Sequence, residues 1–361
     1  MRQWAKRTGL VAVMVASAAV AACGGGSDDA SDGASDDPSG GTGATVRLLT
    51  YDSFALPEEA AAAFEARTGA TVEVVATGDS GTMLTGALLS AGDPEGDVIF
   101  GIDDTSATRA LDADLLDPVD PSVLDDVPAG YRLDGAAAEL LVPIDTGDVC
   151  MNLDAGWFAD NGIAPPTDLD QLTEPAYRDL LVVPSPVTSS PGLAFLIGTV
   201  DRYGEDGWSE YWAQLEANGV RVRPSWDDAY YSDYTVSGGD RPIVLSYASS
   251  PPAEVVFSEG ERTEPASTVM LDSCTAQVEY AGVLRGTEQP ELAAELVEFM
   301  VSDAWQRELP LTNFVFPVTD VELPVEFQQW APRAEDPMGL APERIDEGRD
   351  RWIEAWREQM E

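Results

Sequence analysis

The stretch VRLLTYDSFALPEEAAAAFEARTGATVEVVA, residues 46–76, decides the fold class. Its apolar runs at 46–50 and 72–76 are typical of buried strands. The alanine-rich run 57–67 between them favours a helix that stops near Gly69. A further apolar strand, DVIFG, follows at 97–101. Strands that alternate with helices at these spacings predict a parallel α/β sheet.

The alternation continues along the chain, which is long enough for two α/β lobes at 361 residues. Further strands are expected at 145–153, 180–183, 241–247 and 277–283. Further helices are expected at 192–203, 208–218, 290–300 and 342–360. In the last helix, Ile345, Trp352, Ile353 and Trp356 share one face, so we expect these side chains to serve as core anchors.

Residues 1–22 are predicted to be a secretory signal peptide. Arg2, Lys6 and Arg7 give a positive start, a short apolar run follows, and small residues precede Cys23. This pattern resembles the bacterial lipobox, in which the cysteine is lipidated and becomes the mature N-terminus. Residues 23–43 are then the lipidated Cys and an acidic linker, which we expect to be flexible because it has no large apolar side chain.

Cys150 and Cys274 are the remaining cysteines of the chain. An even pair in an oxidising compartment predicts a disulfide. The alternative is two buried free thiols. A bond between these positions would join the segments on which we expect the chain to cross between two lobes.

Composition excludes several classes of function. A formal net charge of −45 argues against nucleic-acid binding, which needs a basic surface. The chain has no histidine, and its one lysine, Lys6, lies in the predicted signal peptide. Without these residues the mature chain has no Ser-His-Asp or Cys-His mechanism, lysine Schiff base or histidine metal site. Catalysis by a pair of carboxylates stays open on composition, since Asp and Glu total 65, but no one pair stands out, and we expect no enzyme, no metal and no cofactor.

Polar and aromatic motifs follow several of the predicted strands. In open α/β sheets, ligands bind outside the carboxyl ends of the strands. A helix start can also hold hydroxyl or phosphate oxygens through its free N–H groups. The motifs are TYDSF (50–54), GIDD (101–104), TSSPGL (188–193), SWDDAY (225–230) and LSYASSP (245–251).

With these motifs in this order, the chain resembles the thiamine-binding proteins of bacterial ABC importers. Besides TYDSF and SWDDAY, the residues that carry the resemblance are DVIFGIDD (97–104), LVPIDTGD (141–148), TSSPGLAFL (188–196), VLSYASSP (244–251) and LPLTNFVFPV (309–318). The resemblance runs from about Val46 to the C-terminal helix. It implies the type II periplasmic-binding-protein fold, with two α/β lobes joined by a two-strand hinge around a ligand cleft. The expected division is 44–149 for the first part of lobe 1, 150–274 for lobe 2, and 275–361 for the return to lobe 1 and the C-terminal helix.

The resemblance also implies a set of ligand-binding residues. Thiamine carries a thiazolium ring with a fixed positive charge, which aromatic faces attract. Its flat aminopyrimidine has an amino group that can donate a hydrogen bond to a carboxylate. Serine hydroxyls would contact the hydroxyethyl end or a phosphate on it. Known members of the family have tryptophan in the last motif, at the position that is Phe314 in this chain. The positions are Tyr51, Asp103, Ser189, Ser190, Trp226, Tyr247 and Phe314.

The expected protein is thus an extracytoplasmic lipoprotein that captures thiamine, or its phosphates, and delivers it to the permease subunits of an ABC importer. We expect a monomer that meets the membrane only through its lipid. Alternatives within the same fold are a ferric-ion site at Tyr230 and Tyr231, or a polyamine site built from acidic and aromatic residues. A secreted hydrolase using paired carboxylates is the alternative of a different class.

Overall fold

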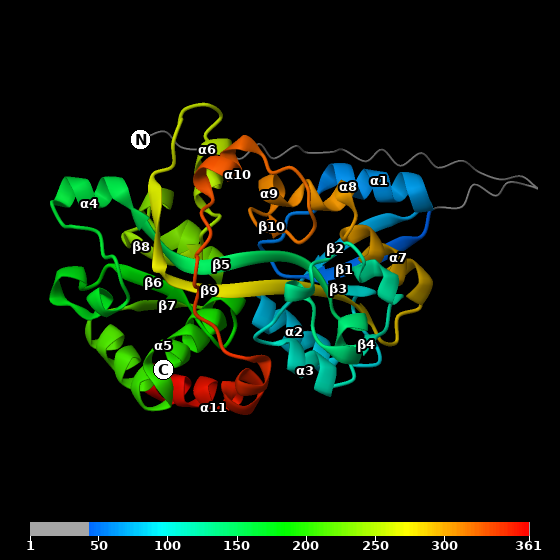
Figure 1. Cartoon of the computed structure of the whole chain (residues 1–361), viewed down its shortest axis with the longest axis horizontal. Coiled ribbons are helices and arrows are strands. Elements are labelled where there is room, and N and C mark those ends of the chain that lie inside the picture. The colour runs from blue at the N-terminus through cyan, green and yellow to red at the C-terminus, as the bar shows by residue number, and fades with distance from the viewer. Residues whose placement is uncertain (1–42, 361) are drawn as a thin grey trace, which may run out of the picture. The chain divides into compact units, whose positions relative to one another are not determined.

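The computed structural model describes residues 43–360 (Figure 1). The predicted signal peptide, the lipidation of Cys23 and nearly all of the predicted linker lie outside these residues. No helix in the described part of the chain has both the length and the apolar character needed to cross a membrane.

The opening stretch folds as its pattern predicts. Strands β1 (Thr45–Thr50), β2 (Thr71–Ala76) and β3 (Val98–Asp103) form a parallel sheet in the order β2-β1-β3. Helix α1 (Glu58–Thr68) ends at Gly69, which adopts a left-handed conformation with φ of 75°. Helices α2 (Ser80–Leu89) and α3 (Ala107–Asp112) follow β2 and β3. Strand β3 extends to Asp103, so the GIDD motif belongs partly to the strand and not to a loop after it.

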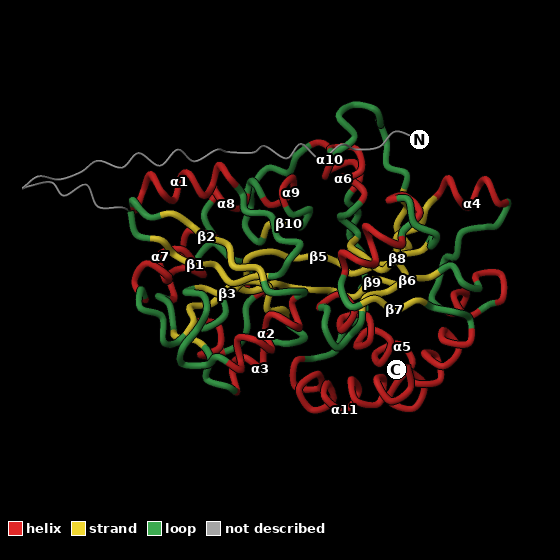
Figure 2. Tube along the Cα trace, turned by 180° about the vertical axis from the view of Figure 1, so that it is seen from behind, coloured by secondary structure: helices red, strands yellow, loops and turns green. Residues whose placement is uncertain are grey.

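Two long antiparallel strands, β5 (Val142–Asp154) and β9 (Ser267–Leu284), run side by side through the middle of the described part (Figures 1 and 2). The continuous sheet has the strand order β2-β1-β3-β9-β5-β8-β6-β7. Short strands β4 (Leu116–Asp117) and β10 (Phe316–Pro317) pair with β9 and β5. Both long strands exceed their predicted lengths, because each continues from one half of the sheet into the other.

The other half of the sheet contains β6 (Leu181–Pro184), β7 (Arg221–Arg223) and β8 (Ile243–Tyr247). Strand β6 is parallel to both of its neighbours. The helices here are α4 (Ala155–Asn161), α5 (Ser190–Ala217) and α6 (Pro251–Val256). We predicted separate helices at 192–203 and 208–218; they are continuous in α5 except at Gly204, whose backbone is not helical.

The C-terminal part contains α7 (Pro290–Met300), α8 (Asp303–Gln306), α9 (Leu309–Thr312), α10 (Val325–Trp330) and α11 (Pro342–Met360). Helix α11 packs against α5, and Ile345, Trp352 and Trp356 are buried as predicted, while Ile353 is partly buried. The segment 331–341 leads to α11 along β9, where Met338 N donates to the Cys274 carbonyl at 2.8 Å. The chain therefore runs past the centre of the sheet once more after β5 and β9 (Figure 1).

The hydrophobic core has separate large clusters in the two halves of the sheet. One contains Phe64, Phe100 and Trp305 among strands β1 and β3 and helices α1 and α7. Another contains Trp212 and Trp356, between α5 and α11. This separation fits the predicted lobes, although the boundaries at 149 and 274 stay predictions.

The predicted disulfide is present. Cys150 on β5 is bonded to Cys274 on β9, at a sequence separation of 124. Both cysteines are buried. The bond ties together the two strands on which we expected the chain to cross between lobes.

Candidate functional site

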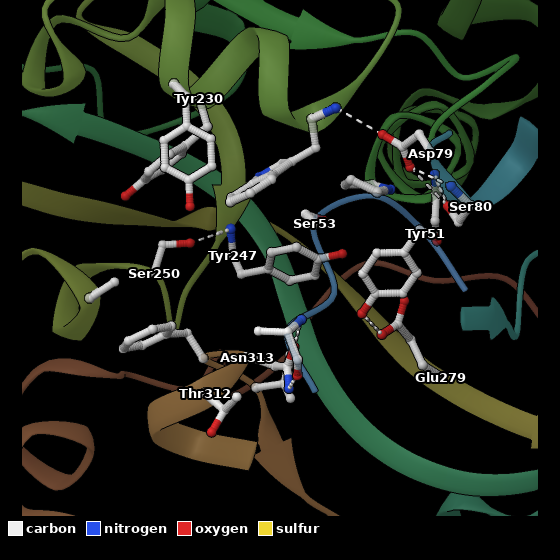
Figure 3. A pocket seen from close by; sticks show the side chains of 18 of the residues that line it. Tyr51, Ser53, Asp79, Ser80, Tyr230, Tyr247, Ser250, Glu279, Thr312 and Asn313 are labelled. Atoms are coloured by element: carbon white, nitrogen blue, oxygen red, sulfur yellow. Dashed lines mark hydrogen bonds between the residues drawn. The ribbon is translucent and has the colours of Figure 1, made fainter. Parts of the chain in front are cut away.

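A cavity of about 200 Å³ opens between segments from both halves of the sheet. Its wall is formed by the loop after β1, the N-termini of α2 and α5, the segments after β7 and β8, one side chain of β9, and the turn after α9 (Figure 3). Loops after parallel strands and helix N-termini meet here, as expected for an open α/β sheet.

Tyr51 forms part of the wall directly after β1. Its ring lies over Gly101, where a Cβ atom would overlap the ring, so the close approach needs glycine at 101. The Tyr51 hydroxyl donates to Glu279 Oε2 at 3.1 Å (Figure 3). Burial, followed by the negative charges of Glu279 and Asp145, holds the pKa of Tyr51 well above its usual range, so it stays a neutral donor.

An aromatic wall stands opposite, on the segment after β7. Trp226 stacks on Tyr230 with ring centroids 4.9 Å apart and an angle of 18° between the rings, and Tyr231 meets both rings edge-on. The Trp226 indole N–H donates to Ser246 Oγ at 3.0 Å, which fixes the ring plane. The Tyr230 hydroxyl is buried and has no hydrogen-bond partner among the described residues.

Two carboxyl groups line the cavity. Asp79 precedes α2 and accepts from the backbone N–H groups of Ser80 at 2.7 Å and Trp226 at 2.8 Å (Figure 3). Burial raises its pKa, and these hydrogen bonds act in the opposite direction. Glu279 projects from β9, and its pKa is well above the usual range because of burial and then the charges of Asp145 and Asp103. Asp145 is buried and interacts with Glu279, and burial raises its pKa to about 8.

Phe314 lines the cavity from the turn after α9. Its φ of 55° lies in the left-handed region, which is strained for a residue with a bulky side chain, of order 1–3 kcal/mol. Its ring packs edge-on against Phe257, 5.3 Å between centroids. These two rings come from opposite halves of the sheet and meet at the cavity, although 67% of the surface of Phe257 is exposed.

The structure brings together five of the seven predicted ligand-binding residues. Tyr51, Ser190, Trp226, Tyr247 and Phe314 all line the cavity.

Ser189 and Asp103 do not line it. Ser189 is the residue before α5 and is buried. Asp103 is fully buried behind Ser190, whose hydroxyl donates to it.

The sequence reasoning missed the two carboxyl groups that do line the cavity, Asp79 and Glu279. Each had a usable signal. Asp79 follows β2, at the same carboxyl edge of the sheet as Tyr51, so the strand-end rule applied to it as well. Gln277 and Glu279 are polar residues two positions apart in a predicted buried strand, which places both on the same face.

The arrangement suits a small, flat cation. None of the residues that line the cavity is Lys, Arg or His. Aromatic faces and carboxylates are the groups that attract an organic cation. Residues 43–360 contain no group of three or more His, Cys, Asp or Glu side chains placed to hold a metal ion.

Comparisons with known proteins agree with this chemistry. The family model described as "Bacterial extracellular solute-binding protein" matches residues 93–334. The thiamine-binding periplasmic protein of Salmonella typhimurium is 30% identical over 319 residues, which cover 86% of this chain and 92% of the relative. The protein of the same name from Escherichia coli is 29% identical over 319 residues, with the same coverage of both chains.

Solved structures give the same fold. A periplasmic thiamin binding protein aligns with a TM-score of 0.74 and 27% identity, covering 88% of this chain and 96% of its own. Iron-bound HitA from Pseudomonas aeruginosa aligns with a TM-score of 0.68 over 88% of this chain and 99% of its own, and at 18% identity it indicates the fold alone. The α/β architecture is thus that of periplasmic binding proteins, as predicted.

Proposed function

Because the chain belongs to the bacterial extracellular solute-binding protein family, and such proteins are extracytoplasmic binders and not enzymes, we propose that its solute is thiamine. The single observation that carries this proposal is the cavity itself. Asp79 and Glu279 line it together with stacked aromatic rings, and no basic side chain does. The names of the relatives support the same ligand.

In the proposed complex, the aromatic faces of Tyr51, Trp226 and Tyr247 hold the two rings of thiamine. Burial raises the pKa of Asp79 and Glu279, and a bound cation would favour their ionised forms, which complement the positive charge and can accept from the exocyclic amino group. A carboxylate that accepts from a charged or polarised N–H forms a stronger hydrogen bond than a neutral acceptor. The cavity is also below the roughly 300–1,000 Å³ common for drug-sized ligands, which favours a compact one.

The test is isothermal titration calorimetry of the purified protein with thiamine, together with mass spectrometry of any small molecule released on denaturation. We expect one site, and an Asp79→Asn variant that binds thiamine at least about tenfold more weakly. Asp125→Asn, which changes an exposed carboxylate outside the cavity, is the matched control and should bind like the unmodified protein. No heat of binding with thiamine, and a different released molecule, would refute the proposal.

A ferric ion is the rival ligand at Tyr230 and Tyr231, which both line the cavity. Iron needs phenolate ligands, but burial raises the pKa of both tyrosines, and Tyr230 is stacked on Trp226. A coloured protein as purified would favour iron. A polyamine would instead be identified by its mass in the released fraction.

We further propose that the protein is a lipoprotein that delivers its solute to an ABC importer. The support is the sequence Val20-Ala21-Ala22-Cys23 and the acidic stretch after it. Cys23→Ser should move the protein from the membrane fraction to the medium, because a lipid chain would be its anchor. A variant that stays in the membrane fraction would contradict the anchor.

A further inference from the structure

Three buried carboxyl groups lie in a row across the middle of the sheet. Asp103 on β3 and Asp145 on β5 each stand directly opposite Glu279, which is on β9 between these two strands. Directly opposite side chains project from the same face of a sheet, with Cβ atoms about 4.5–5.5 Å apart. Each of the three residues is at most 5% exposed. Carboxylates this close repel one another when all are ionised, so the row favours the binding of a proton.

Asp103 has the most hydrogen-bond donors in this row. Its carboxyl group accepts from the hydroxyls of Ser190, Thr105 at 2.7 Å and Ser106 at 2.8 Å. Burial raises the pKa of Asp103, and these hydrogen bonds act in the opposite direction, because they favour its ionised form. A negative charge on Asp103 in turn raises the pKa of Glu279.

Glu279 and Asp145 have fewer donors. Glu279 accepts from the Tyr51 hydroxyl at 3.1 Å (Figure 3) and, at the limit of hydrogen-bond distance, from Gln277 Nε2 at 3.5 Å. One carboxyl oxygen of Asp145, Oδ2, is buried and has no hydrogen-bond partner among the described residues. The carboxyl groups of Asp145 and Glu279 lie within hydrogen-bonding contact of each other. A proton held between them would supply a donor, as in other pairs of carboxyl groups that share one proton.

The groups that face this pair are acidic or neutral. Burial raises the pKa of Glu279 well above its usual range, and the charges of Asp145 and Asp103 raise it further. Tyr51, after β1, and Tyr247, at the end of β8, stay neutral, because burial holds the pKa of each well above its usual range. None of the residues that line the cavity is Lys, Arg or His. These surroundings favour one proton on the pair when no cation is bound.

Glu279 connects the pair to the ligand, because its side chain lines the cavity, whereas that of Asp145 does not. A cation in the cavity offsets the repulsion between two ionised carboxylates, so it lowers the pKa of the pair. The bound cation and the proton therefore compete for these two carboxyl groups.

We propose that Asp145 is a positioning residue for the solute: it shares one proton with Glu279, and the bound cation displaces that proton. The inference rests on the proposed function. On binding, the O–H bond of the pair breaks, the proton passes to water or buffer, and two carboxylates remain near the fixed charge of thiamine. Because binding releases a proton, affinity should rise with pH by up to about tenfold per pH unit below the pKa of the free pair. Burial raises the pKa of Asp145 to about 8, which places this effect between pH 6 and pH 8.

The experiment is calorimetric titration of the protein with thiamine at pH 6, 7 and 8, each in two buffers whose ionisation enthalpies differ. The difference in heat between the two buffers gives the number of protons released on binding. We expect about 0.5–1 proton released at pH 7, and an affinity at least about tenfold higher at pH 8 than at pH 6. The thiazolium charge is fixed and a neutral aminopyrimidine loses no proton here, so a released proton comes from the protein.

Two variants test the pair. In Asp145→Asn, an amide replaces the like charge and can donate to Glu279, which then ionises without a ligand. Thiamine should still bind, but the release at pH 7 should fall below about 0.2 proton, and affinity should change less than about threefold between pH 6 and pH 8. Glu279→Gln should also abolish the release, with weaker binding, and it tests the pair if Asp145→Asn does not fold.

Two controls separate the pair from other carboxyl groups. Asp79 also lines the cavity, but it accepts from Ser80 N, Ser80 Oγ and Trp226 N, which favour its ionised form. Asp79→Asn should therefore weaken binding and keep the proton release. Asp154→Asn changes a carboxylate at the far end of β5, outside the cavity, where asparagine can also accept from Trp157 N. It should keep both the affinity and the release.

The outcomes are distinct. Thiamine binding without proton release, or tighter binding at lower pH, overturns this inference and leaves the proposed function standing. Unchanged release in folded Asp145→Asn removes Asp145 from the role, whereas release that is lost in Asp79→Asn assigns the proton to Asp79 instead. No heat of binding with thiamine at any of the three pH values overturns the proposed function and this inference together.

Discussion

Trp226 is fixed from several directions by other residues of the chain. Its ring stacks on Tyr230, its indole N–H donates to Ser246, and its backbone N–H donates to Asp79. The last contact joins segments from the two halves of the sheet, since Asp79 precedes α2 and Trp226 follows β7. An aromatic face held in this way loses little entropy when it stacks on a flat ligand.

Trp226→Ala should weaken thiamine binding by more than about tenfold, or on the order of 1–3 kcal/mol, through loss of the stacking face and the cation–aromatic contact. Calorimetry measures the change. The control is Trp157→Ala, which removes a tryptophan of α4 that does not line the cavity, and it should leave the affinity unchanged. Equal affinities for the two variants would remove Trp226 from the site.

The buried carboxyl group of Asp145 should make stability depend on pH. Asp145 is 1% exposed, and one of its carboxyl oxygens has no hydrogen-bond partner among the described residues. Burial raises its pKa to about 8, from about 3.9 in an unfolded chain. The native state therefore holds a proton that the unfolded chain releases between these values, so stability falls as pH rises through this window.

Asp145→Asn should abolish this part of the pH dependence. We compare the melting temperature of the variant with that of the unmodified protein. This comparison should favour the variant more at pH 8 than at pH 5, because an amide does not ionise. Thermal unfolding at both pH values measures the difference. The opposite trend, with the variant losing more at pH 8, would mean that Asp145 is ionised in the native state.

At the scale of elements, a glycine in each of two helices is expected to affect stability in opposite directions. Gly204 interrupts α5 with φ of 73° and ψ of 172°, a region of backbone space that essentially only glycine occupies. Gly86 lies inside α2, and a Cβ added to it would meet no atom within 4 Å. The bend at Gly204 separates the part of α5 that faces the cavity from the part that packs near α11.

Gly204→Ala should lower the free energy of unfolding by about 1–3 kcal/mol, because alanine would be strained at this φ and ψ. Gly86→Ala, the matched substitution, should raise it by about 0.5–1 kcal/mol, because alanine favours a helix. Denaturant unfolding of both variants gives the comparison. Changes of the same sign in the two variants would contradict the strained backbone assigned to Gly204.

At the largest scale, the two halves of the sheet in residues 43–360 are joined at their centre by β5, β9 and the segment that leads to α11. The disulfide between Cys150 and Cys274 joins the two strands, and Met338 hydrogen-bonds beside it to the Cys274 carbonyl and to Ala276 N. Helix α11 packs on α5, yet its Arg349 donates to Thr108 Oγ1 at 2.7 Å near the start of α3 in the other half. Contacts of this kind connect the halves away from the cavity.

Replacing both Cys150 and Cys274 with alanine should destabilise the protein by about 2–5 kcal/mol, since the bond restricts a long loop in the unfolded chain. The ligand should still bind, because neither cysteine lines the cavity. Thermal unfolding and thiamine titration of the same variant measure the two effects. Unchanged stability would show that the bond contributes little, and lost binding in a folded variant would show that it shapes the cavity.

The sequence by itself determined the order of the helices and strands, because the spacing of apolar residues and the glycines and prolines that end an element are local properties. The run 46–76, the stop at Gly69 and the apolar face of the last helix all formed as predicted. The absence of histidine, and of lysine beyond Lys6, excluded Ser-His-Asp and Cys-His mechanisms and a lysine Schiff base from the sequence alone. The disulfide between the paired cysteines formed as predicted, and five of the seven expected ligand-binding residues line the cavity, while their role in binding stays a prediction.

Only the tertiary structure decided which carboxyl group faces the cavity. Asp103 lies at the end of a strand, as a ligand-binding residue should, but the packing of α5 against it places Ser190 between its carboxylate and the cavity. Glu279 comes from a strand far away in sequence and reaches the cavity because β9 runs beside β5 and β3. Strand-end rules locate a site along the chain, whereas the side chain that reaches it depends on long-range packing that no local pattern contains.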